Sequence, residues 1–305
     1  MSRHQGRYVD SFSITPSFGM QHGGQRSSTH GEHPHSQNYQ HRQQQDPYRG
    51  SNEYDTYTKL IIVSHGETIN EVFPQWLRLA YKAGEEYYQA YDLNMPVTIP
   101  KRPAEHYRYD PPLTEHGNFT AEFIGKGIKL AGYDPYMIYS SPELRCVQTA
   151  AGISRAAGDV PICIEPALAD WAQLVPEDSS KNWLSFDKLK SFGYPIVEGY
   201  RPHLSSLPKR ESPEDYLRRL SSFVKDLSKS TNRMAVLVTN SHAIEVARNN
   251  TWTTAEQICQ IKKMIRNCAT CEVGVDSNNR VTALQPMMLP FTKTLKEAQE
   301  KTMAK

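Results

Sequence analysis

Short apolar runs alternate with longer amphipathic stretches along most of the chain. The apolar runs are KLIIVS (59–64), YMIYS (136–140), PICIE (161–165) and RMAVLVTN (233–240). Each run is nearly continuous in apolar side chains, which is typical of strands buried on both faces of a parallel sheet. The pattern therefore predicts four strands at these positions.

Three stretches with apolar residues at helical spacing accompany these runs: residues 113–132, 142–158 and 212–230. The first begins after Thr114, a favoured N-cap, and ends at Gly132, which suits the position just after a helix. The second has Pro142 where a first helical residue would stand, and the third combines Ser212 as a cap with Pro213 at that position. Strands alternating with helices of this length predict an α/β fold with a mostly parallel central sheet flanked by helices.

The first 55 residues differ in composition from the rest of the chain. Residues 1–55 are rich in Gln, His and Ser and offer little to bury, which predicts a disordered tail. Residues 56–293 are predicted to form one domain, and residues 294–305 a C-terminal tail. Six of the eleven histidines lie in the first tail. No fixed ligand spacing repeats there, so a polar low-complexity segment is favoured over a metal site.

Charge and cysteine content exclude several functional classes. Residues 1–50 carry five Arg and three acidic residues, so residues 51–305 carry 30 basic and 30 acidic side chains and sum to zero. A neutral main body gives no electrostatic case for nucleic-acid or membrane binding, and no apolar stretch approaches the ~20 residues of a membrane span. Five widely spaced cysteines predict reduced thiols in a cytoplasmic protein. The single pair Cys268 and Cys271 does not predict zinc, and neither a metal nor a cofactor is expected.

Four residues with chemically useful side chains follow the predicted strands. His65 comes directly after the first strand, and Arg145 lies in the first turn of the helix after the second. Asp170 and His242 come after the third and fourth strands. Because the carboxyl ends of parallel strands lie at one edge of a sheet, we expect these side chains around one hollow. The set suits phosphoryl transfer, in which a neutral histidine attacks phosphorus, cations hold the oxygens and a carboxylic acid protonates the leaving group.

Several longer motifs contain these residues: SHGE (64–67), SSPELRCVQTA (140–150), EPALADW (165–171) and NSHA (240–243). In this order they resemble the histidine phosphatase superfamily, whose first motif is normally Arg-His-Gly-Glu. Further stretches are similar to one branch, the phosphatase domain of TULA (Sts) proteins: DLNMPVTIPKR (92–102), YRPHLS (200–205) and ESPEDYLRR (211–219). The resemblance implies a phosphoglycerate mutase-like fold and a phosphorylated protein or small phosphomonoester as substrate. It also makes a homodimer plausible.

The resemblance implies a role for each of the four residues. His65 matches the nucleophile that becomes phosphohistidine, and Arg145 matches the arginine that grips the phosphate. Asp170 stands where the TULA-type enzymes have a glutamate as proton donor. His242 matches the second phosphate-contacting histidine, although the strand before it is one residue longer than usual.

Two departures from the family pattern affect the expected chemistry. Ser64 replaces the phosphate-binding arginine before the nucleophile, and Thr68 stands where TULA-type enzymes carry another arginine. Each hydroxyl is predicted to give the phosphate one neutral hydrogen bond, which is weaker than a charge-assisted one. Losing one preorganised donor typically costs about 10²–10³ in rate. With fewer cations nearby, His65 is also predicted to be easier to protonate, so that oxyanion binding improves toward pH 6.

Three functional interpretations remain open from the sequence. The first is a weakly active or inactive pseudophosphatase that retains a phosphate-binding pocket. The second is an active phosphomonoesterase, such as a phosphotyrosine phosphatase, whose missing arginine is supplied by Arg102, Arg108 or Arg201. The third is a phosphatase or mutase of small metabolites.

Overall fold

The protein is described here from a computed structural model. The structure describes residues 60–81, 87–174, 182–230, 233–248, 250–275 and 281–283. All of them belong to one compact unit, Asn52–Lys305. The tails predicted at residues 1–55 and 294–305 lie outside the described residues.

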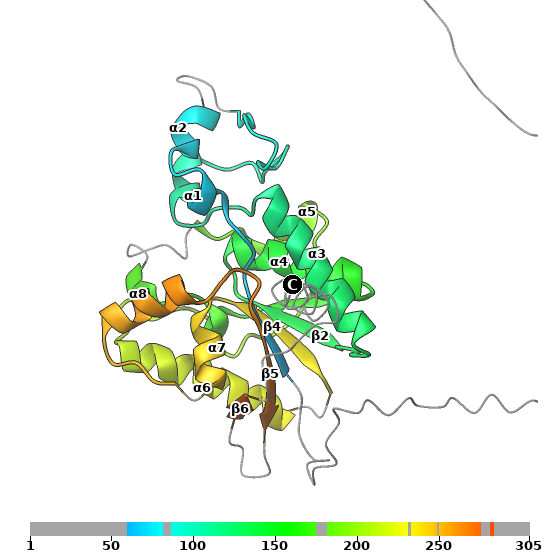
Figure 1. Ribbon diagram of the computed structural model, residues 1–305, viewed down its shortest axis with the longest axis vertical. Coiled ribbons are helices and arrows are strands. Elements are labelled where there is room, and N and C mark those ends of the chain that lie inside the picture. Colours follow the sequence, from blue (N-terminus) through cyan, green and yellow to red (C-terminus); the bar gives the residue numbers. More distant parts are fainter. Residues whose placement is uncertain are drawn as a thin grey trace, which may run out of the picture. The chain divides into compact units, whose positions relative to one another are not determined.

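A mixed sheet forms the centre of the described unit (Figure 1). Its strands are β1 (Leu60–Ser64), β2 (Met137–Ser140), β3 (Ile162–Ile164), β4 (Ala235–Thr239), β5 (Thr270–Val275) and β6 (Val281–Ala283). In the described residues the strand order is β3-β2-β4-β1-β5-β6. Strands β3, β2, β4 and β1 are parallel, while β5 is antiparallel to both β1 and β6. The four predicted strands and the mostly parallel α/β fold are confirmed, and the antiparallel edge was not predicted.

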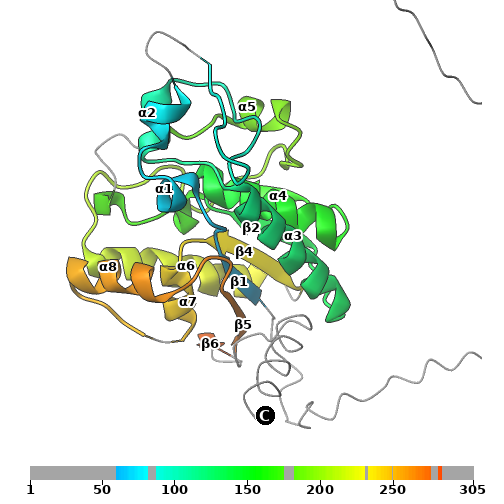
Figure 2. The same cartoon turned by 45° about the horizontal axis from the view of Figure 1, so that its top comes forward.

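Helices cover both faces of this sheet (Figure 2). They are α1 (Ile69–Val72), α2 (Trp76–Ala80), α3 (Glu115–Leu130), α4 (Leu144–Ala157), α5 (Phe186–Ser191), α6 (Pro213–Ser230), α7 (His242–Ala247) and α8 (Ala255–Met264). Short 3-10 turns are η1 (Ala104–Arg108), η2 (Pro166–Leu168) and η3 (Ala172–Leu174). In the described ranges, no helix is long and apolar enough to span a bilayer.

Alternate residues of the parallel strands β1 to β4 contribute to two separate cores. In β1, Ile61 and Val63 pack with α3, α4 and α5, whereas Leu60 and Ile62 pack with α6, α7 and α8. Successive side chains of a strand point to opposite faces, and here both faces are buried. This explains why the strand sequences read as continuous apolar runs rather than as alternating ones.

The helix caps follow the sequence signals with one exception. Thr114 accepts a hydrogen bond from the N–H of Gly117, and Ser212 accepts one from the N–H of Asp215. Helix α4, however, begins at Leu144, so Pro142 precedes the helix instead of opening it. The reason is a distant partner: the buried carboxylate of Asp110 accepts the N–H of Leu144 at 2.6 Å.

A close contact with the start of α3 fixes the segment that follows His65. The N–H of Thr114 donates to the carbonyl of Glu67, and the Thr114 hydroxyl donates to the Glu67 carboxylate at 2.7 Å. A Cβ on Gly117 would lie only 2.3 Å from the Glu67 carbonyl oxygen, so only glycine permits this approach. Glu67, the last residue of the first motif, therefore has a structural role: it holds this segment against α3.

Candidate active site

A cavity of about 220 Å³ opens beyond the carboxyl ends of the parallel strands. Its wall includes His65 after β1, Arg145 from the first turn of α4 and Asp170 after η2. Thr68 lines it as well. The structure thus brings together three of the four predicted strand-end residues and one of the two hydroxyl residues.

His65 is in the state that nucleophilic attack requires. Its Nδ1 lies 2.8 Å from the carbonyl oxygen of Gly66, which can only accept, so Nδ1 carries the proton and Nε2 keeps its lone pair. Burial, followed by the positive charges of Arg145 and Lys262, lowers the pKa of His65 to about 3. The prediction that His65 titrates near neutrality is therefore wrong. The sequence did not show how deeply the ring is buried or that a second cation lies beside it.

This lowered pKa makes the stability of the protein depend on pH. His65 binds a proton near its ordinary pKa of 6.5 in the unfolded chain but only near pH 3 in the folded protein. Stability is therefore highest above pH 6.5 and falls as the pH drops toward 3. We expect the protonation of His65 to lower the free energy of unfolding by about 2 kcal/mol between pH 7 and pH 5. This corresponds to about 1.4 kcal/mol for each pH unit below 6.5.

Urea unfolding of wild type and His65→Gln at pH 7 and at pH 5 measures this contribution. The variant lacks the titrating ring, so its stability is expected to fall by about 2 kcal/mol less than that of wild type between the two values. Equal losses in the two proteins would show that His65 is not held in the neutral form by folding.

Arg145 and Asp170 form a buried charge network in the cavity wall. Arg145 Nη2 lies 3.3 Å from Asp170 Oδ2 and 3.9 Å from Glu143 Oε1. Lys262 Nζ approaches the same Oδ2 atom at 3.4 Å. Burial alone would raise the pKa of Asp170, but Lys262 and Arg145 are among the positive charges that outweigh it, and the pKa falls well below its usual range. Asp170 is thus a carboxylate in this structure and needs a change in its surroundings before it can donate a proton.

The loop that carries Asp170 is held from behind by a second ion pair. Arg219 donates to both carboxylate oxygens of Glu211, at 2.7 and 2.9 Å. Its remaining N–H groups donate to the backbone carbonyls of Ala167, Ala169 and Asp170. Both partners of the pair are almost fully buried. The ESPEDYLRR motif therefore acts in this structure by positioning the Asp170 loop.

Ser64 is placed away from the cavity. Its hydroxyl donates to the carbonyl of Arg266 and accepts the N–H of Ala269, both at 2.9 Å. It is only 3% exposed and does not line the cavity. The geometry thus does not place the Ser64 hydroxyl where it could take over the phosphate contact of an arginine.

His242 is likewise behind the cavity rather than in its wall. Its ring is fully buried, and Nε2 lies 2.9 Å from the carbonyl of Ile258, so Nε2 carries the proton. Nδ1 then accepts from the hydroxyl of Tyr216 at 3.2 Å and lies 3.7 Å from Asp170 Oδ1. Burial lowers the pKa of His242. A neutral ring with both nitrogens engaged is a structural group and a support for Asp170.

Asn240, and not His242, stands next to His65 at the ends of the paired strands. Strands β1 and β4 pair with Ser64 opposite Thr239, so Asn240 stands beside His65 at the strand ends. Arg145 Nη2 donates to Asn240 Oδ1 at 2.8 Å. The buried Nδ2 has no hydrogen-bond partner among the described residues. Matching the strand ends LIIVSH and AVLVTN residue by residue would have found this position.

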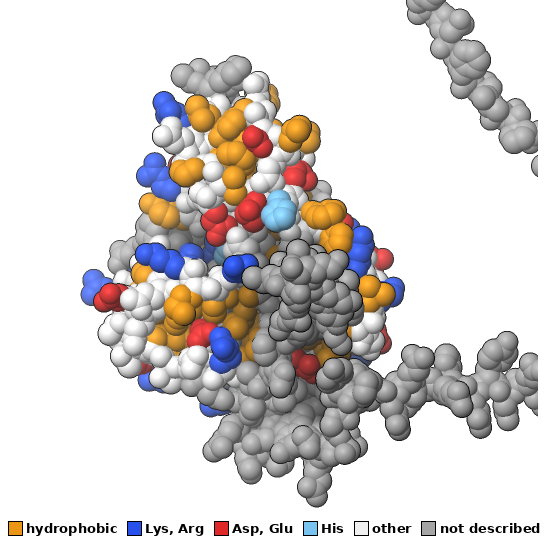
Figure 3. All heavy atoms as spheres, viewed as in Figure 1, with side chains coloured by type: hydrophobic (Ala, Val, Ile, Leu, Met, Phe, Trp, Pro, Cys, Tyr) orange, Lys and Arg blue, Asp and Glu red, His pale blue; other side chains and the backbone are white. Residues whose placement is uncertain are grey.

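Two further cations line the cavity, and neither belongs to a sequence motif used above. They are Arg108 at the end of η1 and Lys262 in the last turn of α8. Lys and Arg side chains gather over α8 in the space-filling view (Figure 3). Of the arginines proposed to replace the missing one, Arg108 reaches the cavity wall. Arg102 is committed to Asp110 in a buried ion pair, and Arg201 does not line the cavity.

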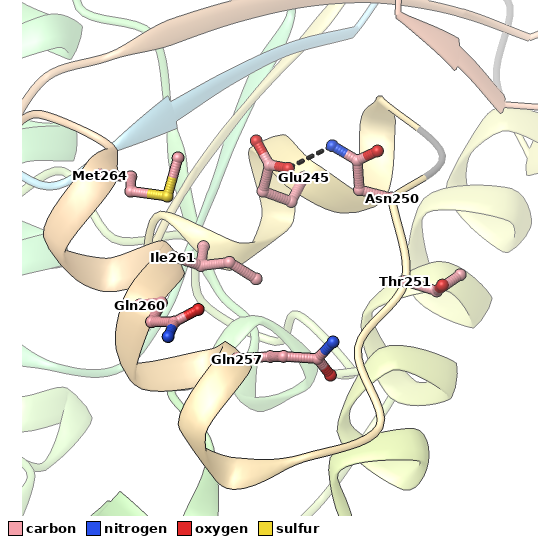
Figure 4. A pocket seen from close by; sticks show the side chains of 7 residues that line it. All are labelled: Glu245, Asn250, Thr251, Gln257, Gln260, Ile261 and Met264. Carbon is pink, nitrogen blue, oxygen red and sulfur yellow. Dashed lines mark hydrogen bonds between the residues drawn. The ribbon is translucent and has the colours of Figure 1, made fainter.

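A second hollow lies between α7 and α8 and has different chemistry (Figure 4). Its lining residues include Glu245, which accepts a hydrogen bond from Asn250, and it contains neither Lys nor Arg. A carboxylate without a lining cation disfavours a phosphate. In the part of the chain that the structure describes, no group of three or more His, Cys, Asp or Glu residues could hold a metal ion.

Comparison with known proteins agrees with this geometry. The family model of the histidine phosphatase superfamily (branch 1) matches residues 102–285. The chain belongs to this superfamily. The match includes Arg145 and Asp170 but begins after the first motif, which contains His65. In that motif this chain has Ser64 in place of the arginine of the family pattern.

Curated relatives come from the same branch that the motifs resembled. Ubiquitin-associated and SH3 domain-containing protein A of Mus musculus is 32% identical over 52% of this chain and 27% of its own length. Ecdysteroid-phosphate phosphatase of Drosophila melanogaster is 27% identical over 77% of this chain and 32% of its own length. The chain therefore matches about a third or less of the length of these relatives.

A solved structure supports the fold. The ecdysone phosphate phosphatase of Bombyx mori, crystallised in complex with tungstate, has a TM-score of 0.61 and 20% identity. The match covers 75% of this chain and 92% of the Bombyx mori chain. At this identity the likeness supports the shared fold of the superfamily and not the activity.

Proposed function

We propose that this member of the histidine phosphatase superfamily binds the phosphoryl group of a phosphorylated protein or small phosphomonoester and hydrolyses it very slowly. The observation that carries the proposal is that the cavity keeps several cations but lacks the arginine of the first motif. Arg145 and two further cations line the cavity, whereas the arginine before the nucleophile is replaced by Ser64, which points elsewhere. The site keeps positive charge for binding and lacks part of the set that stabilises the transition state.

Two more features support slow turnover. Asn240, which stands beside His65 at the strand ends, is a neutral amide and adds no positive charge to the site. Asp170 is ionised in this structure, so it begins as an anion that repels the phosphate rather than as an acid that protonates the leaving group. Binding with little hydrolysis is the behaviour of a pseudophosphatase.

An active phosphomonoesterase is the second candidate, and His65 is the observation that favours it. The ring is neutral and its Nε2 keeps a lone pair, which is what attack on phosphorus requires. A relative named for the hydrolysis of ecdysteroid phosphates points to the same reaction class. In this case phosphohistidine would form at His65, with Arg108 or Lys262 supplying the missing charge.

Hydrolysis of an aryl phosphate and binding of tungstate separate the two candidates. We expect wild type to bind tungstate in calorimetric titration while its hydrolysis rate stays close to that of His65→Ala. The His65→Ala variant is the matched control because it removes the nucleophile and leaves Arg145 in place. A rate in wild type far above that of His65→Ala would favour the active enzyme. Failure of wild type to bind tungstate would contradict both candidates.

A further inference from the structure

Lys262 lies far in sequence from the motifs that mark the site, yet it lines the same cavity. Its Nζ is 3.4 Å from Asp170 Oδ2, and Arg145 Nη2 is 3.3 Å from the same oxygen. Lys262 lines the cavity together with His65 and Arg145. Two cations thus converge on one carboxylate oxygen of Asp170, which is one of two acidic residues among the described residues of the cavity lining, the other being Glu71.

The end of α8 that carries Lys262 is tied to the first motif by the turn that follows it. Ser64 binds this turn through its hydroxyl, which contacts Arg266 and Ala269, and through its N–H, which donates to the carbonyl of Ala269. The carbonyl of His65 accepts the N–H of Cys268 at 3.0 Å. An arginine at position 64 has no acceptor for the N–H of Ala269, so it could not reproduce both contacts of the Ser64 hydroxyl. The serine at that position and the placement of α8 are therefore parts of one local arrangement.

We infer that Lys262 is a phosphate-binding residue, which supplies from α8 the second cation that the first motif lacks. The inference rests on the proposed phosphate binding in this cavity. When a phosphoryl group enters, the ammonium of Lys262 leaves Asp170 and donates to a phosphoryl oxygen opposite Arg145. Its side chain is 47% exposed, so it has the freedom to make this change. The ligand is a phosphomonoester dianion, for which two converging cations are complementary.

The neighbouring Lys263 provides a matched control. It stands in the same last turn of α8 and is exposed, but it lines neither the cavity nor the second hollow. Replacing either lysine by glutamine removes the same charge from the same helix turn. A difference between the two variants therefore reports on position and not on net charge.

Calorimetric titration of tungstate at pH 7 into wild type, Lys262→Gln, Lys262→Arg and Lys263→Gln tests the inference. We expect Lys262→Gln to weaken binding about tenfold. This is the lower end of the usual effect of losing a hydrogen bond between charged groups, and we expect the lower end because Lys262 is half exposed. Lys262→Arg retains the charge and is expected to restore most of the affinity. Lys263→Gln is expected to bind as wild type does. Thermal unfolding of each variant checks that the fold is intact.

Each other outcome has a defined meaning. If wild type binds tungstate and Lys262→Gln binds equally well, the role of Lys262 is refuted while the phosphate pocket stands. If both glutamine variants weaken binding to the same extent, the effect is one of net charge and the inference is also refuted. If wild type does not bind tungstate, the proposed function itself fails.

Discussion

Replacing Arg219 by methionine is expected to lower the free energy of unfolding by about 3–5 kcal/mol, the usual cost of removing one partner of a buried ion pair. The Arg219 and Glu211 side chains are 8% and 2% exposed. Without the guanidinium, the Glu211 carboxylate would stay buried without its partner, and the carbonyls of Ala167 and Ala169 would lose their donor. Urea unfolding at pH 7 measures the loss.

Two variants sharpen this test. Arg218 is the adjacent residue, but its side chain is 75% exposed and pairs with the exposed Asp215, so Arg218→Met is expected to leave the unfolding midpoint nearly unchanged. The double variant Arg219→Met with Glu211→Leu removes both charges and is expected to recover part of the lost stability. A loss below about 1 kcal/mol in Arg219→Met would mean that the pair does not hold the Asp170 loop in place.

The parallel part of the sheet could be predicted because burial on both faces leaves a direct mark on the sequence. All residues of a strand such as Leu60–Ser64 are buried, so its sequence is a continuous apolar run with no exposed polar face. The antiparallel strand β5 has the sequence TCEVGV, in which Thr270 and Glu272 interrupt the apolar residues. Such a pattern is too short and mixed to separate a strand from a loop without knowing its partner β1.

The strand-end residues were predictable only as far as local order determines them. His65, Arg145 and Asp170 follow their strands closely, and the structure places all three around one cavity. Asn240 was missed because strand pairing, and not chain order, determines which residue stands beside His65. His242 was the more conspicuous residue, although two further positions carry it into helix α7 and behind the cavity wall.

Lys262 could not be predicted because its position depends on contacts across most of the chain. Helix α8 shows a capping box at Thr254 and an amphipathic pattern, which predict a helix but not its place. That place depends on the packing of Ile258 with α6 and α7 and on the hydrogen bonds between Ser64 and the turn at residues 266–269, more than 200 positions away. The serine that reads as a loss in the sequence is thus one of the residues that position a cation.

Replacing Asp170 by asparagine is expected to tighten tungstate binding about 10- to 100-fold, because it removes a negative charge a few ångströms from the bound oxyanion. The carboxylate is ionised and pairs with the two cations that a phosphate would need, Arg145 and Lys262. Asparagine has nearly the same shape and keeps an oxygen that can accept the N–H of Trp171. In the variant both cations are released from the carboxylate and face the ligand.

Calorimetric titration at pH 7 measures this gain, with Asp187→Asn as the control for net charge. Asp187 is an exposed residue in the first turn of α5 and does not line the cavity, so its variant is expected to bind tungstate as wild type does. The lowered pKa keeps Asp170 ionised between pH 6 and 8, the window around the ordinary histidine pKa, so the gain is expected to be constant over that range. Weaker binding by Asp170→Asn than by wild type would contradict this expectation. It would mean that the main effect of the carboxylate is to position Arg145 and Lys262 for the ligand, and not to compete with the ligand for them. In that case Asp170 would be a support of the phosphate site, and the slow turnover proposed above would have to come from Asn240 and the missing arginine alone.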